Sequence, residues 1–195
     1  EQFRTTLYRQ TMFAEFELRI AELSRAGQTL TADLLCEEYR KLNEAYYGPD
    51  IVLDENIALE WARIPHFYYN YYVFQYATGF SAAVAIANRI LAEGAPAVAD
   101  YKKFLSGGSS TDPISLLKIA GVDMSSPAPV NSALQLFGEL VDETVVTELG
   151  LDALRLSTLE ALLHAARKVV FDVLLGVLEA SSEGRGGLHW PPVQI

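Results

Sequence analysis

The sequence predicts an all-α protein, and three observations support this class. Apolar residues recur at intervals of three and four along most of the chain, which is the spacing of one helix face. Proline, glycine and capping residues divide the chain into segments of helix length. No segment shows the alternation of apolar and polar residues that is typical of a half-buried strand. We therefore expect a set of packed helices.

Two helices are expected at the beginning of the chain. Apolar residues at a helical period predict the first over residues 3–24, and Gly27 is suited to the turn after its end. Thr31 is suited to cap the start of a second helix, because its hydroxyl can accept a free backbone N–H. This second helix is expected to end near Tyr46, before the Gly-Pro pair that starts at Gly48.

A long helix is expected in the middle of the chain. A short helical turn over residues 58–62 leads to Pro65, and proline is favoured at the first position of a helix. The pattern predicts one helix from Pro65 to near Gly94. Residues 81–87 are small, so a neighbouring helix can approach closely, and this half is expected to pack against the core.

Further helices are expected in the rest of the chain. Pro96 and Pro113 are each expected to open a short helix, with Asp112 as a turn or capping residue and a glycine-serine turn over residues 107–110 between them. Longer helices are expected over residues 129–146 and residues 151–180. The chain then ends in a proline-rich, non-helical stretch.

The charge balance excludes one class of partner. The net charge is -10, with 15 basic and 25 acidic residues, whereas nucleic-acid binding needs a basic surface. We therefore expect no nucleic acid partner. The single cysteine, Cys36, cannot form an internal disulfide, which favours a reducing, cytoplasmic location, and we expect it to be a small buried residue.

Membrane association is not expected either. No segment reaches the roughly 18 consecutive apolar residues of a membrane-spanning helix. The beginning of the chain has no signal-peptide pattern, since an amphipathic helical pattern is already present at Phe3. The chain is therefore expected to begin in the middle of a helix.

The stretch of residues 65–79 is the main candidate for function, because it is dense in tyrosine and contains a histidine. On a helix, Tyr68, Tyr72 and Tyr76 would share one stripe, with Tyr69 beside Tyr72. His66 would lie in the first turn, where the helix dipole favours an anion or a developing oxyanion. Buried tyrosine hydroxyls need partners, so the stripe is either core with internal acceptors or a groove for a polar ligand.

Several motifs, in a fixed order, resemble those of one peptidase family. They are Tyr-Arg-Gln-Thr-Met-Phe-Ala-Glu-Phe-Glu at 8–17, Tyr-Tyr-Gly at 46–48, Trp-Ala-Arg-Ile-Pro-His-Phe-Tyr-Tyr-Asn at 61–70, Tyr-Ala-Thr-Gly-Phe at 76–80, Phe-Leu-Ser-Gly-Gly at 104–108, Pro-Ile at 113–114 and Ala-Gly-Val-Asp-Met at 120–124. Together they resemble the C-terminal part of oligoendopeptidase F, a zinc metallopeptidase similar to thimet oligopeptidase. The resemblance extends over about residues 1 to 143.

This resemblance implies a fold and a cofactor. Such enzymes are helical clamshells with a deep channel that admits short peptides. Their zinc is held by a His-Glu-x-x-His helix and a later glutamate. The histidines of this chain are His66, His164 and His189, and none lies in that motif. We therefore expect zinc in the complete enzyme, its ligands upstream of Glu1, and no metal site within these residues.

The resemblance also implies roles for the histidine and the tyrosines. The family uses such residues to hold the peptide and to donate hydrogen bonds to the tetrahedral intermediate. The expected catalytic residues are His66, Tyr68 and Tyr72, and these two tyrosines are preferred because they share the stripe near His66. The expected substrate-binding residues are Tyr69, Tyr71, Tyr76 and Arg63. Arg63 is as well suited to a salt bridge as to a substrate carboxylate.

Two acidic residues of the first helix carry a weaker signal. Glu15 could orient a metal ligand, but a solvated or ion-paired helix face is the preferred interpretation of both Glu15 and Glu17, since Arg9 and Arg19 lie nearby in the sequence.

Two segments and two functions are therefore expected. Residues 1–146 are interpreted as the C-terminal portion of a peptidase catalytic domain, and residues 147–195 as a helical extension through which the protein could associate with itself. The preferred function is the substrate-binding, oxyanion-stabilising part of a zinc endopeptidase that hydrolyses oligopeptides. The alternative is a non-catalytic helical module, derived from such a peptidase, that binds peptides or proteins.

Overall fold

The structure is a computed structural model that describes residues 1–69 and 71–144. These residues form helices joined by turns and contain no β-strand, so the predicted all-α class is confirmed. None of the described helices is both long and apolar enough to cross a membrane. The expected helix over residues 151–180 and the proposed self-association surface lie outside the described residues.

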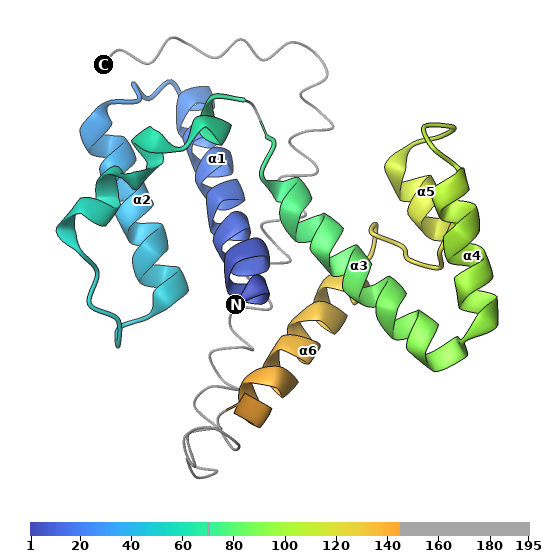
Figure 1. The fold of residues 1–195 in the computed structure, drawn as a ribbon. Coiled ribbons are helices and arrows are strands. Elements are labelled where there is room, and N and C mark those ends of the chain that lie inside the picture. The colour runs from blue at the N-terminus through green and yellow to red at the C-terminus, as the bar shows by residue number, and fades with distance from the viewer. Residues whose placement is uncertain (70, 145–195) are drawn as a thin grey trace. The chain divides into compact units, whose positions relative to one another are not determined.

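The described chain divides into two compact units, one of residues 1–77 and one that begins at Thr78. In the first unit, the π-helical segment η1 (Phe3–Tyr8) continues directly into α1 (Arg9–Arg25), as the sequence predicted for one helix. The second helix, α2 (Ala32–Tyr47), packs beside α1 (Figure 1). Its predicted cap is confirmed, because the Thr31 hydroxyl accepts the Leu34 N–H at 3.3 Å.

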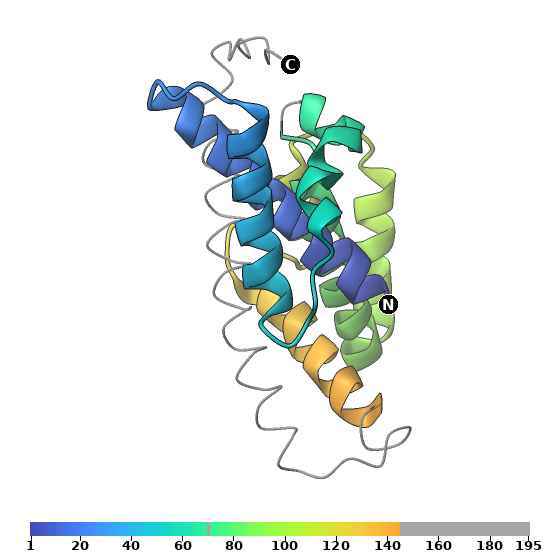
Figure 2. The ribbon, with the colours of Figure 1, turned by 90° about the vertical axis from the view of Figure 1, so that its left-hand side faces the viewer.

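Aromatic rings fill the core of the first unit. The ring of Phe16 lies 5.1 Å from those of Tyr39 and Phe67, and the ring of Phe13 lies 5.2 Å from Phe67, all in edge-to-face geometry. Such contacts add to the stability gained from burial alone. The 3-10 helix η2 (Glu55–Arg63) lies beside α2 (Figure 2) and covers more of the sequence than the short turn expected there.

The prediction of one long helix from Pro65 is wrong. Pro65 opens only a short 3-10 turn, η3 (Pro65–Tyr68), and helix α3 (Phe74–Glu93) begins several residues later. Between them Tyr71 has a φ of 54°, in the left-handed region that interrupts a right-handed helix. The predicted end is confirmed, because Gly94 follows α3 with a φ of 69°.

The second unit contains the rest of α3, α4 (Ala95–Ser106), α5 (Pro113–Ile119) and α6 (Ala128–Thr144). The predictions from both prolines are confirmed, because each lies at the start of its short helix, and α4 and α5 pack side by side (Figure 1). The Asp112 carboxylate accepts the Ser115 N–H at 2.9 Å and so caps α5, as expected.

The small residues of α3 lie in the core of this second unit. Ala82 and Ile86 are buried in one cluster with Ala120 and Val122, as expected for the alanine-rich half of the helix. Arg89, on the same helix, joins α3 to the end of α5, since Nη1 donates to the Ala120 carbonyl at 2.8 Å.

Candidate functional site

His66 and three tyrosines gather around the start of α3, and we call these four residues the aromatic cluster. The imidazole of His66 is stacked on the ring of Tyr72, with centroids 5.2 Å apart and planes 7° from parallel. Tyr69 and Tyr76 meet the imidazole edge-on at 6.1 and 6.0 Å. The rings of Tyr72 and Tyr76 are 5.6 Å apart. Both sides of the interrupted helix therefore contribute to one group of rings.

The aromatic cluster is open to a ligand. Tyr69, Tyr72 and Tyr76 are 60, 41 and 36% exposed, and His66 is half-buried. A side-chain hydrogen bond with Tyr72 raises the pKa of Tyr76 above its ordinary value. The Tyr76 phenol is therefore neutral near pH 7 and can donate a hydrogen bond. The arrangement offers several donors close to one another, on a surface lined with rings.

The predicted stripe of Tyr68, Tyr72 and Tyr76 is wrong, because these residues do not lie on one helix. Tyr72 and Tyr76 meet His66, but Tyr68 lies on the 3-10 turn, and its hydroxyl donates to the Ala62 carbonyl at 3.3 Å. The helical spacing that favoured Tyr68 over Tyr69 does not exist in the fold. Tyr69, which the sequence predicted to bind substrate rather than to act in catalysis, lies edge-on to the imidazole of His66.

Tyr71 is separated from the other tyrosines by burial. It is 7% exposed and belongs to the aromatic core of the first unit. Its hydroxyl accepts a hydrogen bond from Arg25 at 3.3 Å. Burial, partly offset by the nearby Arg25 charge, raises the pKa of Tyr71. A substrate would therefore not reach this side chain in the present arrangement.

Arg63 takes part in a salt bridge, one of the two interpretations that the sequence left open. Its guanidinium contacts the carboxylate of Glu60, which also accepts Arg9 Nη2 at 2.6 Å and the Tyr39 hydroxyl at 2.7 Å. Burial opposes the charge on Glu60, but these donors hold its pKa below the ordinary value. Arg63 itself remains 72% exposed, so contact with a substrate carboxylate is still a prediction.

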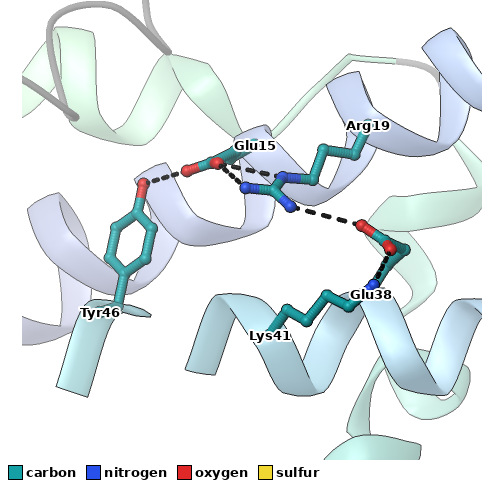
Figure 3. A network of polar contacts seen from close by, with 5 residues as sticks. All are labelled: Glu15, Arg19, Glu38, Lys41 and Tyr46. Atoms are coloured by element: carbon teal, nitrogen blue, oxygen red, sulfur yellow. Dashed lines mark hydrogen bonds and ion pairs between the residues drawn. The ribbon is translucent and has the colours of Figure 1, made fainter. Parts of the chain in front are cut away.

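Glu15 belongs to an ion-paired network between α1 and α2 (Figure 3). It accepts Arg19 Nη2 at 2.8 Å and the Tyr46 hydroxyl at 2.9 Å. Arg19 also reaches Glu38 at 3.3 Å, and Lys41 donates to the same carboxylate group at 2.8 Å. The structure thus gives Glu15 the role of an ion-paired helix face, and its suggested influence on a metal ligand stays a prediction.

Glu17 differs from the sequence interpretation, because it is not on a solvated or ion-paired face. It is completely buried, and its Oε1 accepts the backbone N–H of Tyr71 at 3.2 Å. The sequence contained a signal for this, since residues 13, 16, 17 and 20 fall on one helix face and the other three are apolar. A carboxylate in an apolar stripe is often functional or structurally paired.

The described residues do not fit a zinc ion. They contain no group of three histidine, cysteine, aspartate or glutamate side chains close enough to hold a metal. His66 is surrounded by rings rather than by carboxylates or other histidines. Cys36 is half-buried rather than fully buried as expected, and its sulfur accepts the indole N–H of Trp61 at 3.4 Å.

Comparison with known proteins identifies the class. The sequence pattern of Peptidase family M3 matches residues 1–136. The chain is 56% identical over 143 residues to oligopeptidase PepF of Bacillus subtilis (strain 168), an alignment that covers 73% of this chain and 21% of the relative. It is 45% identical over 143 residues to the chromosomal oligoendopeptidase F of Lactococcus lactis subsp. cremoris, covering 73% of this chain and 24% of that protein.

A solved structure of a related protein has a similar fold. A crystal structure from Chlamydophila abortus, of a protein assigned as a peptidase, superposes with a TM-score of 0.66 at 40% identity, covering 71% of this chain and 23% of that chain. The helical fold and the sequence therefore agree on one protein family. The chain belongs to peptidase family M3, and the resemblance to oligoendopeptidase F is confirmed. It spans about a fifth to a quarter of the length of these relatives.

Proposed function

We propose that this chain supplies the substrate-facing part of an M3 endopeptidase that hydrolyses oligopeptides. The observation that carries the proposal is the stack of His66 on Tyr72, 5.2 Å apart, with exposed phenols on either side. The names of the relatives, an oligopeptidase and an oligoendopeptidase, supply the substrate class. Residues 1–146 are proposed as the peptidase portion, and residues 147–195 as a separate extension.

In this proposal His66 and Tyr72 donate hydrogen bonds to the oxyanion that forms when water attacks the scissile carbonyl. A donor placed where negative charge develops stabilises the transition state more than the substrate, because the charge is absent from the ground state. Removing one such donor typically costs about 3 to 4 kcal/mol in the barrier. The ring stack supports the assignment, because it holds both side chains in one orientation before substrate arrives.

The remaining tyrosines are proposed to bind the peptide. Tyr69 and Tyr76 border the imidazole and present both ring faces and hydroxyls to the surface. Tyr68 is proposed to contribute at the edge of this surface, and Arg63 to meet a substrate carboxylate. Tyr71, expected from the sequence to bind substrate, is left out of this proposed surface because it is buried in the core.

Zinc is proposed as the cofactor of the complete enzyme, on the basis of the family. The described residues do not fit the ion, so no step through it is assigned to them. What these residues contribute is the orientation of the peptide and hydrogen bonding to its carbonyl.

Two substitutions in the full-length protein test this function. His66→Ala and Tyr72→Phe are expected to leave zinc content unchanged and to lower kcat, by about a hundredfold for Tyr72→Phe, with a smaller effect on KM. Tyr101→Phe is the matched control, because Tyr101 loses the same hydroxyl but lies in the second unit beside Phe104. Hydrolysis of a quenched fluorescent peptide gives the rates, and metal analysis gives the zinc content.

The result that would remove the catalytic assignment is normal turnover by both variants. Peptide binding without any cleavage by the full-length, zinc-supplemented protein would favour the non-catalytic binding module instead. Tyr68→Phe tests the catalytic role that the sequence predicted for Tyr68. A large loss of kcat would support that role, and normal turnover would support a position at the edge of the surface.

A further inference from the structure

A buried carboxylate lies directly beneath the segment that presents the tyrosines. Glu17, on α1, has no exposed surface, and its Oε1 accepts the Tyr71 N–H at 3.2 Å. The amides of Tyr72 and Val73 also favour the charged form of this carboxylate. These three amides precede α3, where backbone N–H groups lack partners within the helix and the helix dipole favours a negative charge.

No cation neutralises this carboxylate among the described residues. Glu17 takes part in none of the described ion pairs, and its Oε2 has no hydrogen-bond partner among the described side chains and amides. From the segment above it, Tyr71 is the titratable group in contact, and that hydroxyl is held by Arg25. From α1 itself, Glu22 also acts on Tyr71. The backbone amides are therefore the principal partners of Glu17.

The charged side chains of α2 that reach α1 contact a different face of α1 from the one that carries Glu17. Glu38 and Lys41 are engaged with Arg19, and residues two positions apart on a helix point in nearly opposite directions. Residue 17 thus faces away from the ion-paired network of Figure 3. Burial raises the pKa of Glu17 to about 7, although the amides of residues 71–73 lower it in part.

The contact reaches a residue whose backbone is in a strained conformation. Tyr71 has a φ of 54°, which costs free energy for a residue with a side chain and persists only where other contacts hold it. The next residue, Tyr72, carries the ring that is stacked on His66. A carboxylate that fixes the backbone at residues 71–73 therefore also fixes where the Tyr72 ring lies.

We propose that Glu17 is a positioning residue of the aromatic cluster: its carboxylate accepts the Tyr71 N–H, interacts with the amides of the next two residues and thereby holds Tyr72 against His66. The catalytic part of this inference rests on the proposed function, whereas the positioning part rests on the geometry alone. The contact joins residues 54 positions apart in the sequence, so it is a feature of the tertiary structure.

The first experiment uses the unaltered full-length protein, so that folding of a variant is not an issue. The amide resonances of residues 71–73 are followed by NMR between pH 5 and 9. We expect them to shift together with one midpoint, because one carboxylate titrates beside all three. Independent shifts, or no common transition at any pH at which the protein stays folded, would overturn the proposal.

The second experiment removes the charge with Glu17→Gln. A glutamine keeps one acceptor but is not ionised, so we expect loss of the common amide transition and weaker nuclear Overhauser contacts between the rings of Tyr72 and His66. We expect kcat to fall about tenfold or more with KM changed much less, because misplacement of a catalytic group affects the chemical step. Glu17→Asp should restore part of kcat.

Glu37→Gln is the matched control, because it removes the same charge from an exposed ion pair with Lys41 on α2. Unchanged ring contacts and unchanged kcat in folded Glu17→Gln, when Tyr72→Phe lowers kcat, would overturn the positioning role. If His66→Ala and Tyr72→Phe both leave kcat normal, the proposed function fails, and the ring contacts and amide titration still decide whether Glu17 positions Tyr72.

Discussion

The buried carboxylate of Glu17 predicts an unusual dependence of stability on pH. Its pKa is raised from 4.5 to about 7, chiefly because burial disfavours the charged form. The folded protein therefore binds a proton that the unfolded chain releases at lower pH. Since stability falls with rising pH wherever the folded state binds more protons, this side chain destabilises the fold as pH increases.

The size of the effect follows from the two pKa values. A difference from 4.5 to about 7 corresponds to roughly 3 kcal/mol. The contribution is fully present below about pH 4.5, declines between there and pH 7, and is lost above pH 7. Small domains have net stabilities of about 5 to 15 kcal/mol, so a loss of this size would be a large part of the total.

Urea unfolding of the wild type and Glu17→Gln at pH 5 and pH 8 measures this effect. The free energy of unfolding of Glu17→Gln relative to wild type is expected to rise by about 2 to 3 kcal/mol between these values, because glutamine does not titrate. Glu37→Gln, from an exposed ion pair, should change this difference little. If Glu17→Gln has the same pH dependence as the wild type, the Glu17 carboxylate does not titrate between pH 5 and pH 8, and the prediction is wrong.

Two further substitutions test contacts on which the fold depends. Tyr39→Phe removes the 2.7 Å hydrogen bond to Glu60. Urea titration is expected to show a loss of about 1 to 3 kcal/mol in the free energy of unfolding. No change would mean that the hydrogen bonds from the two arginines are sufficient for the Glu60 carboxylate. Gly121→Ala would place a Cβ against the guanidinium of Arg89, at a residue whose φ is 79°. It should lower Tm more than Gly108→Ala, because φ is also positive at Gly108 but no atom lies within 4 Å of the new Cβ there. Equal losses of Tm would show that the Arg89 side chain moves aside freely.

Much of the fold could be predicted from local signals. Thr31 and Asp112 start their helices because a side-chain oxygen next to free N–H groups acts over only three residues. The same holds for Pro96 and for the glycine after α3. The motifs at 8–17 and 61–70 were likewise sufficient for the family, which a match over residues 1–136 confirms.

The break in the predicted long helix could not be found in this way. No proline or glycine interrupts residues 66–73, and propensity is a weak guide when tertiary contacts compete with it. One tertiary contact at the break is with Glu17, whose carboxylate accepts the Tyr71 N–H. The composition of the aromatic cluster changed accordingly, with Tyr69 meeting His66 in place of Tyr68.

The sequence by itself therefore determined the helical class, most helix ends and the peptidase family, because each depends on residues that are near one another in the chain. Only the tertiary structure decided which tyrosines surround His66 and which charges are buried. The physical reason is that burial and ring contacts join residues far apart in the chain, as the hydrogen bond between Glu17 and Tyr71 does over 54 positions.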